Sequence, residues 1–150
     1  MDVRIRQATG NDIEAVHQME IEWAREDIVY GFVPTDANQL IKRLGPYFLV
    51  AEDGKDAIGF AYGSLRTSEH PDHLAVIPAG QRYFELDAMY VEPESRDRGV
   101  GGALLESLIA AARSDNIARF NVFTAAKDQE RIIRFYRRHG FTPWGAQLFI

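Results

Sequence analysis

The chain has 150 residues, of which 46% are hydrophobic and 26% charged, and its net charge is −5. This size and balance indicate one compact domain. The lack of cysteine excludes disulfides, thiol nucleophiles and thiolate metal sites. Negative charge argues against a nucleic-acid partner, because such binding depends on neutralising phosphates. The sequence has no apolar run of membrane-spanning length and no signal-peptide core at its N-terminus, so we expect a cytoplasmic protein without a membrane partner.

Charge is distributed unevenly along the chain. Residues 1–95 contain 8 Lys or Arg and 17 Asp or Glu, whereas residues 96–138 contain 9 and 5. The first part is therefore acidic and the second basic. We expect the acidic part to suit a cationic ligand and the basic part an anionic one.

The hydrophobic pattern predicts alternating strands and helices. In chain order we expect a strand at 3–8, a helix from 9 to about 25, a helix at 35–45, a hairpin over 47–66, a strand at 82–93, a helix to about 115, a strand at 118–125, a helix from about 127 to 139 and a final strand at 141–150. Thr9 and Asp12 form a capping-box pattern where the first helix begins. Gly140 marks the end of the last helix.

Three glycines and two arginines stand where a strand gives way to a helix, in VEPESRDRGVGGALL, residues 91–105. A helix start exposes unpaired N–H groups and the positive end of the helix dipole, which together can hold an anion. Gly99, Gly101 and Gly102 leave that backbone unobstructed, and Arg96 and Arg98 add donors suited to phosphate oxygens. The alternative is that the glycines only permit a tight turn and close helix packing.

Two nucleotide-binding motifs fit this stretch poorly. A P-loop needs a lysine and a hydroxyl residue after its glycines, and neither follows here. A dinucleotide fingerprint needs a third glycine inside a parallel strand–helix–strand unit, whereas GVGGAL follows an antiparallel segment. A nucleotide-binding module is therefore the least favoured of the functions considered for this sequence.

The stretch RDRGVG satisfies (Q/R)-x-x-G-x-(G/A), and with it the sequence resembles the GNAT superfamily of acyl-CoA-dependent N-acetyltransferases. The resemblance covers essentially the whole chain and includes YVEPE before the motif and FYRRHGF about forty residues later. It implies an α/β (α+β) GNAT fold, with a mixed, mostly antiparallel sheet of six to seven strands flanked by about four helices. It also implies acetyl-CoA as co-substrate. A non-catalytic acyl-CoA-binding or regulatory domain of the same fold is the alternative to an enzyme.

The resemblance implies roles for individual residues. The backbone of Met89, Tyr90 and Val91 would pair with the pantetheine arm and hold the acetyl carbonyl. Tyr136 matches the tyrosine that protonates the departing thiolate, and Gln129 stands where many members have an asparagine that bonds the pantetheine. The segment expected at the coenzyme A diphosphate comprises Arg96, Asp97, Arg98, Gly99, Val100, Gly101 and Gly102. The helical spacing of Tyr136 also allows a second interpretation, a core aromatic whose hydroxyl simply finds a partner.

Attack by an amine needs a proton acceptor, because an amine of pKa near 10 is about one part in a thousand neutral at pH 7. The period of two along the strand predicts that Glu85, Asp87 and Met89 share one face. Glu85 and Asp87 are therefore the candidate bases. Asp87 is slightly favoured, since a number of family members carry an acidic residue four positions before the residue matching Val91. The alternative is that both are solvated carboxylates on an open face, and a bulge would change the face they reach.

The connection between the first two helices is the candidate acceptor wall, which is its role in the family that the sequence resembles. It is flanked by Glu22, Trp23, Tyr30 and Phe32, an aromatic and acidic set that would suit an amine or, equally, could be packing. The acceptor is expected to be a small-molecule or peptide amine. No metal is expected, because His70, Asp72 and His73 lie in a surface loop. The apolar ending LFI offers an edge strand through which a homodimer could form.

Overall fold

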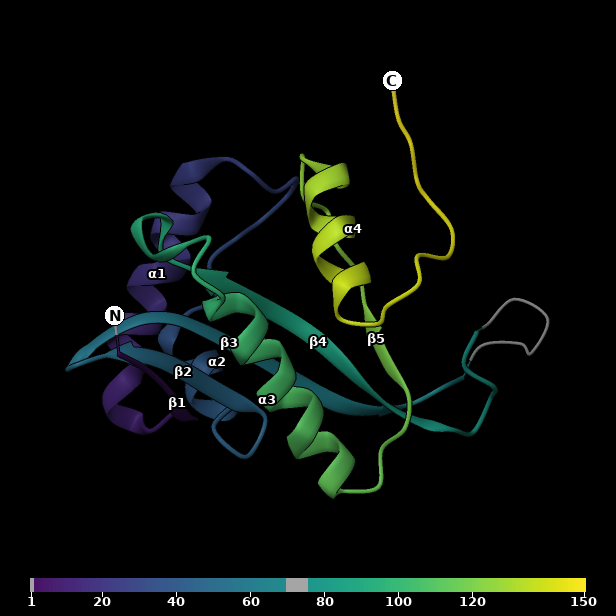
Figure 1. The fold of residues 1–150 in the computed structure, drawn as a ribbon, viewed down its shortest axis with the longest axis horizontal. Coiled ribbons are helices and arrows are strands. Elements are labelled where there is room, and N and C mark those ends of the chain that lie inside the picture. Colours follow the sequence, from purple (N-terminus) through teal and green to yellow (C-terminus); the bar gives the residue numbers. More distant parts are fainter. Residues whose placement is uncertain (1, 70–75) are drawn as a thin grey trace.

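The computed structural model describes residues 2–69 and 76–150. Five strands form one sheet in the order β1-β2-β3-β4-β5, with helices on both faces (Figure 1). In chain order the elements are β1 (Val3–Gln7), a 3-10 turn (Gly10–Asp12), α1 (Ile13–Glu26), α2 (Ala37–Lys42), β2 (Phe48–Asp53), β3 (Asp56–Thr67), β4 (Arg82–Val91), a second 3-10 turn (Pro93–Ser95), α3 (Val100–Ser114), β5 (Phe120–Val122) and α4 (Gln129–Arg138).

The sheet is mixed and mostly antiparallel, as expected. Neighbouring strands from β1 to β4 pair antiparallel, and β4 pairs parallel with β5. The parallel pairing is short, because it joins only Phe84–Leu86 to Phe120–Val122. The described part of β4 beyond Leu86 therefore has an open edge where β5 would otherwise lie.

Apolar side chains cover both faces of the sheet. The cluster between α3 and the sheet includes Leu49, Ala61, Leu104, Leu105 and Leu108. The cluster on the opposite face, under α1 and α2, includes Val16, Leu40, Phe48, Val50 and Phe60. Each fully buried Val, Leu or Phe side chain in these clusters contributes about 1.5–3 kcal/mol of transfer free energy. The two clusters hold α1 and α3 on opposite sides of β4.

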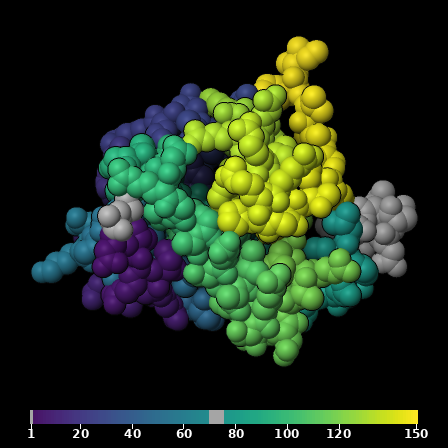
Figure 2. All heavy atoms as spheres, viewed as in Figure 1, coloured from purple at the N-terminus to yellow at the C-terminus, as the bar shows by residue number. Residues whose placement is uncertain are grey.

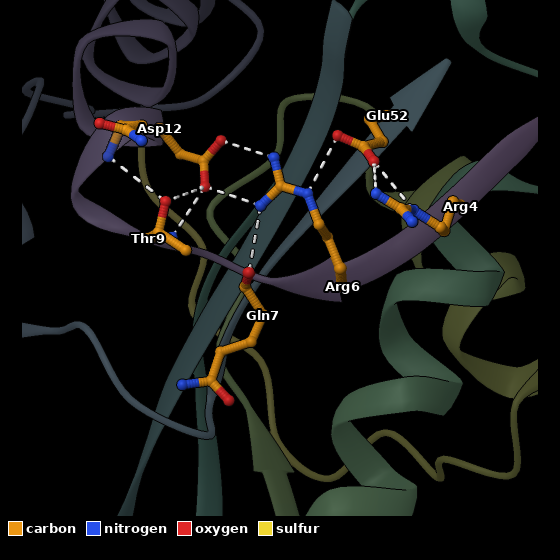
Figure 3. Close-up of polar contacts among 7 residues, drawn as sticks. Arg4, Arg6, Gln7, Thr9, Asp12 and Glu52 are labelled. Atoms are coloured by element: carbon orange, nitrogen blue, oxygen red, sulfur yellow. Dashed lines mark hydrogen bonds and ion pairs between the residues drawn. The ribbon is translucent and has the colours of Figure 1, made fainter. Parts of the chain in front are cut away.

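A polar network ties β1 to β2 and to the start of α1 (Figure 3). The Arg6 guanidinium donates to both carboxylate oxygens of Asp12, each at 2.8 Å, and to Glu52 at 3.0 Å. Arg4 donates to the other oxygen of Glu52. Asp12 also accepts from the Thr9 backbone N–H at 2.7 Å and completes the predicted capping box. The network fixes where α1 leaves the sheet.

Two details of the fold differ from the sequence-based expectation. The predicted final strand at 141–150 is wrong, since these residues have no regular structure and are almost all exposed, and the described sheet has five strands rather than six to seven. Pro143 lacks a ladder donor and Gly145 has a φ of 81°, so the segment cannot run on as a regular strand. The second helix begins at Ala37, capped by Asp36, rather than at Thr35.

The ionised carboxylate of Asp12 should make stability depend on pH. The hydrogen bonds from Arg6 hold the pKa of Asp12 below its usual range, and those from Arg4 and Arg6 do the same for Glu52. Because both folded-state pKa values lie below the unfolded ones, their contribution is full above about pH 5 and is lost as pH falls through the folded values. Asp12→Asn should therefore lower the free energy of unfolding by about 1 kcal/mol at pH 7, because the neutral amide loses the ion pair with Arg6.

The difference between Asp12→Asn and the unmodified chain should shrink as urea titrations are repeated from pH 7 down to pH 3. Asp2→Asn is the matched control, because Asp2 is exposed and makes no bond to the described residues. A difference that stays constant with pH would contradict the assignment.

Candidate active site

A β-bulge in β4 sets the direction of the candidate site residues. Tyr62 pairs with Ala88 and Gly63 pairs with Leu86, so Asp87 is the extra residue on β4. Gly63 makes room for the bulge, because a Cβ there would lie 2.3 Å from the Glu85 carbonyl oxygen. The bulge shifts the alternation of side chains by one position.

The predicted common face for Glu85, Asp87 and Met89 is therefore wrong. Before the bulge, Leu86 packs in the cluster under α3, so Glu85 points toward the α1 side. After the bulge, Ala88 and Tyr90 belong to the α1 side and Met89 packs under α3. Glu85 and Met89 consequently lie on opposite faces of β4.

The open edge of β4 presents backbone donors. Glu92 donates its N–H to the Ile58 carbonyl at 2.9 Å, which sets the phase of the ladder. Tyr90 N–H points the same way as Glu92 N–H, into β3, and the N–H groups of Met89 and Val91 point away from β3 toward the open edge. Of the three predicted pantetheine contacts, two thus have a main-chain donor free for a ligand.

The loop before α3 matches the predicted anion site in its backbone. Asp97 and Gly99 have φ values of 60° and 81°, and Gly99 caps α3 with no side-chain bond to the first turn. Gly101 has ordinary space around it, whereas a Cβ on Gly102 would lie 3.0 Å from the His139 ring. Gly102 therefore permits close packing of the segment after α4, and the uncapped helix start is left for a ligand.

The two predicted arginines of this loop differ. Arg98 is exposed and forms no hydrogen bond or ion pair with the described residues, so its guanidinium is available to a phosphate. The Arg96 guanidinium instead binds Glu26 and the Val91 carbonyl. Asp97 pairs with Arg131 at 3.3 Å on the surface.

Tyr136 lies in the apolar cluster that Met89 and Val91 also contact. Its ring packs edge-on against Phe135 and Phe141, at centroid distances of 5.1 and 5.5 Å. Its hydroxyl has no hydrogen-bond partner among the described residues, and burial raises its pKa to about 12. The phenol therefore stays protonated at neutral pH and has a proton to donate.

The two candidate bases have different surroundings. Asp87 accepts from Arg43 and Arg66, each at 2.7 Å, and from Ser64 at 2.9 Å. Glu85 is half-buried and accepts a single bond, from the Asn121 amide at 2.7 Å. Burial raises the pKa of Glu85. Glu85 is thus a carboxylate with a raised pKa, and it has fewer fixed partners than Asp87.

The predicted acceptor wall is only partly assembled. Trp23 stacks on Phe32 and on Tyr90, with ring centroids 4.3 and 5.3 Å apart, so these aromatics form one surface beside β4. Tyr30 is half-exposed and contacts Phe149 at 5.3 Å. Glu22 is not part of this surface, since it is exposed and binds Gln18 and Arg25.

The α1–α2 connection closes one end of the opening. Tyr30 N–H donates to the Ala125 carbonyl at 3.0 Å, and Lys127 N–H donates to Ile28 at 2.9 Å. Gln129, the expected pantetheine contact, donates to the Ala126 carbonyl at 2.6 Å and holds the same turn. Figure 2 shows the surface hollowed between this dark blue connection, the green segment after β4 and α4 in yellow-green.

Sequence reasoning missed a buried carboxyl, Glu20, which is 1% exposed. One of its oxygens accepts from the Thr35 hydroxyl at 3.1 Å, and the other has no partner in the described structure. Burial raises its pKa. Through its bond to Thr35, Glu20 anchors the α1–α2 connection to α1. The apolar spacing of α1 would have indicated only that position 20 faces the sheet.

The described residues contain no cluster of metal-binding side chains, and no helix among them is long and apolar enough to cross a membrane. His73 and its neighbours at 70 and 72 lie outside the described residues.

Comparisons with known proteins identify the family and the fold. The model of the Acetyltransferase (GNAT) family matches residues 13–141. A GCN5-like protein acetyltransferase of Mycobacterium tuberculosis is 38% identical over 78 residues, which are 52% of this chain and 37% of that protein. The chain thus spans little more than a third of that relative's length.

Solved structures share the fold along almost the whole chain. A predicted acetyltransferase of Clostridium acetobutylicum, solved with acetyl-CoA, has a TM-score of 0.72 at 20% identity, over 99% of this chain and 96% of that one. The aminoglycoside N-acetyltransferase AAC(6')-Iy, solved with the bisubstrate analogue CoA-S-monomethyl-acetylneamine, has a TM-score of 0.73 at 17% identity, over 100% and 97%.

The chain therefore belongs to the GNAT acetyltransferase family. It is an acetyltransferase-family domain, and the similar protein from Clostridium acetobutylicum was solved with acetyl-CoA. The residues present fit that molecule, because an uncapped helix start, a free arginine and an open strand edge follow one another from Met89 to Gly102.

Gly99 offers a test of the diphosphate site. Gly99→Ala forces a Cβ into the left-handed region at a cost of about 1–2 kcal/mol and so moves the first N–H groups of α3. We expect the Kd for acetyl-CoA, measured by titration calorimetry, to rise about tenfold, as for one lost charge-assisted hydrogen bond. Gly54→Ala is the matched control: it carries similar strain, at a φ of 63°, in the β2–β3 turn. Equal affinities for the two variants would contradict this site.

Proposed function

We propose that this domain transfers the acetyl group of acetyl-CoA to the primary amine of a small cationic molecule, or alternatively of a peptide, by direct attack. The observation that carries the proposal is the open end of β4. There the N–H groups of Met89 and Val91 face an opening bounded by α4 and by the aromatic surface of Trp23. A thioester carbonyl bound by one of those donors would be held next to an amine on the α1 side.

In the proposed reaction the amine nitrogen forms a bond to the acetyl carbon, and the carbon–sulfur bond breaks. One of the two N–H groups, that of Met89 or that of Val91, would stabilise the negative charge that develops on the carbonyl oxygen, because it is fixed in the sheet before reaction. The other, about 6.6 Å along the strand, would bind the pantetheine arm. The Tyr136 hydroxyl would give its proton to the departing sulfur. No metal takes part in this scheme.

Glu85 is the better candidate for the proton acceptor. It lies on the α1 side, where the aromatic surface is, and one of its oxygens has no bond to the described residues. Asp87 is held by two arginines and a serine, so both of its oxygens already have fixed partners. We therefore assign Asp87 to holding the bulge and Glu85 to accepting the amine proton, directly or through water.

A cationic acceptor is favoured by the acidity of the first part of the chain, which carries 17 Asp or Glu against 8 Lys or Arg up to residue 95. The aromatic surface of Trp23 and Phe32 would accommodate an ammonium group or its alkyl chain. Similarity to an aminoglycoside N-acetyltransferase supports the small-molecule choice, and similarity to a protein acetyltransferase supports the peptide one.

Turnover tests the function and the role of Tyr136 together. Coenzyme A release should be measured with aminoglycosides, polyamines, amino acids and peptides, for the unmodified chain and for Tyr136→Phe. We expect kcat to fall about a hundredfold in the variant, the usual contribution of a general acid. Thermal stability should be unchanged, because the hydroxyl has no hydrogen-bond partner among the described residues. Acetyl-CoA binding without turnover on any acceptor would instead favour a regulatory domain, and full activity of the variant would make Tyr136 a core aromatic only.

The pH profile distinguishes the two carboxylates. A base acts when deprotonated, so kcat should fall as pH drops through the raised pKa of Glu85. Glu85→Gln should lower kcat about a hundredfold or more and remove that acidic limb. Asp87→Asn should keep the limb and lower stability, because it weakens the bonds from Arg43 and Arg66. The opposite pattern, a limb lost in Asp87→Asn and kept in Glu85→Gln, would reverse the assignment.

A further inference from the structure

A bidentate ion pair joins the end of α1 to the beginning of the diphosphate loop. Arg96 donates from its two terminal nitrogens to the two carboxylate oxygens of Glu26, at 2.7 and 2.8 Å. The side chains are 27% and 21% exposed, so water screens this pair less than a surface pair. The residues are 70 positions apart in the sequence.

The third donor of the same guanidinium reaches β4. Arg96 Nε donates to the Val91 carbonyl at 2.8 Å. The other end of that peptide group, Glu92 N–H, donates to Ile58 at 2.9 Å. The peptide group that ends β4 is thus clamped from both sides, and it directly follows the Val91 N–H that faces the opening.

Glu26 also binds the α1 side of β4. The Tyr90 hydroxyl donates to the same carboxylate at 2.6 Å, and the Arg96 guanidinium lies over the Tyr90 ring, 5.3 Å from its centroid. Burial acts to raise the pKa of Glu26, but the bonds from Arg96 and Tyr90 bring it below its usual value. The carboxylate is therefore ionised at neutral pH. It holds Tyr90, just before Val91, and Arg96, five residues after it.

We propose that Glu26 and Arg96 are positioning residues that brace the junction of β4 and the diphosphate loop. The Glu26 carboxylate holds the Arg96 guanidinium on the Val91 carbonyl and so keeps the end of β4, with its outward N–H groups, in place for the pantetheine arm that both thioesters share. Arg96 does this instead of binding phosphate, because its guanidinium N–H groups already donate to Glu26 and to the Val91 carbonyl. Arg98, which is free in the described structure, supplies the positive charge to the diphosphate.

Affinity for two thioesters separates a brace from a phosphate ligand. The Kd for acetyl-CoA and for acetyl-pantetheine, which lacks the diphosphate, should be measured by calorimetry for Glu26→Gln, Arg96→Gln, Arg98→Gln and the Glu26→Gln/Arg96→Gln double variant. We expect Glu26→Gln and Arg96→Gln each to weaken both ligands by the same factor, about tenfold. The double variant should be no worse than either single one, because both remove one unit. Arg98→Gln should weaken acetyl-CoA alone.

Phosphate binding by Arg96 would give a different result. If Arg96 binds phosphate, Glu26→Gln frees it and leaves acetyl-CoA binding equal or tighter, and Arg96→Gln affects acetyl-CoA alone; either result overturns the brace. Arg96→Lys guards against simple loss of folding. It keeps a charge for Glu26 and should restore the melting temperature, but one ammonium cannot reproduce the fork and the Val91 bond together, so affinity should stay low.

Arg4→Gln is the matched surface control, since it removes an ion pair with Glu52 from an arginine that is 72% exposed and remote from β4. It should leave both Kd values unchanged, and a change as large as that in Arg96→Gln would overturn the proposal. The structural role of Glu26 and Arg96 does not depend on the proposed function; only the reason for that role, positioning acetyl-CoA for transfer, rests on it. These binding assays need no acceptor. A failure to acetylate any amine would therefore contradict the proposed function, whereas the role of Glu26 and Arg96 is decided by the Kd values alone.

Discussion

Pairing between β4 and β5 stops at Leu86, and the candidate active site depends on that stop. A strand edge inside a sheet normally has its donors filled by its neighbour, so a ligand can reach them only where the neighbour leaves. The bulge at Asp87 lies one residue after the last pair and reverses the alternation of side chains there. Together the two features give β4 two functional halves. The half before the bulge turns Glu85 toward α1, and the half after it offers Met89 and Val91 N–H groups to the opening.

The opening separates two electrostatic environments. On the α3 side lie an uncapped helix start and the free guanidinium of Arg98, which suit an anion. On the α1 side lie Glu85, Asp87 and the aromatic surface of Trp23, in the part of the chain that is acidic overall. Asp87 is neutralised locally by Arg43 and Arg66, which leaves Glu85 as the carboxylate able to interact with a cationic amine. A reaction between an anionic donor and a cationic acceptor is best served by this arrangement, because each is attracted from its own side.

Local patterns in the sequence predicted most of the fold, and long-range contacts account for what they missed. The capping box at Thr9 and the uncapped glycine start of α3 depend on residues within a few positions, and both are present. The common face of Glu85 and Met89 failed because period two assumes a regular ladder, and only the partner strand reveals the extra residue. Arg96 was expected at phosphate because its partner, Glu26, is 70 residues away. The final strand failed because Pro143 and the left-handed backbone at Gly145 interrupt residues 141–150.

Helix α1 connects the acceptor side to the co-substrate side. Glu20, Trp23 and Glu26 follow one another at intervals of three, and all three side chains reach the sheet: Glu20 contacts Tyr62 of β3, and Trp23 and Glu26 contact Tyr90 of β4. Glu20 holds Thr35 and with it the α1–α2 connection, Trp23 packs on Phe32 and Tyr90, and Glu26 holds Arg96. A buried carboxyl with an unpaired oxygen is costly, and its retention at position 20 is explained if the connection must be held at a fixed height above β4. The same helix therefore sets the distance from the candidate acceptor wall to the open strand edge and from that edge to the loop before α3, which is the geometry that the proposed direct attack requires.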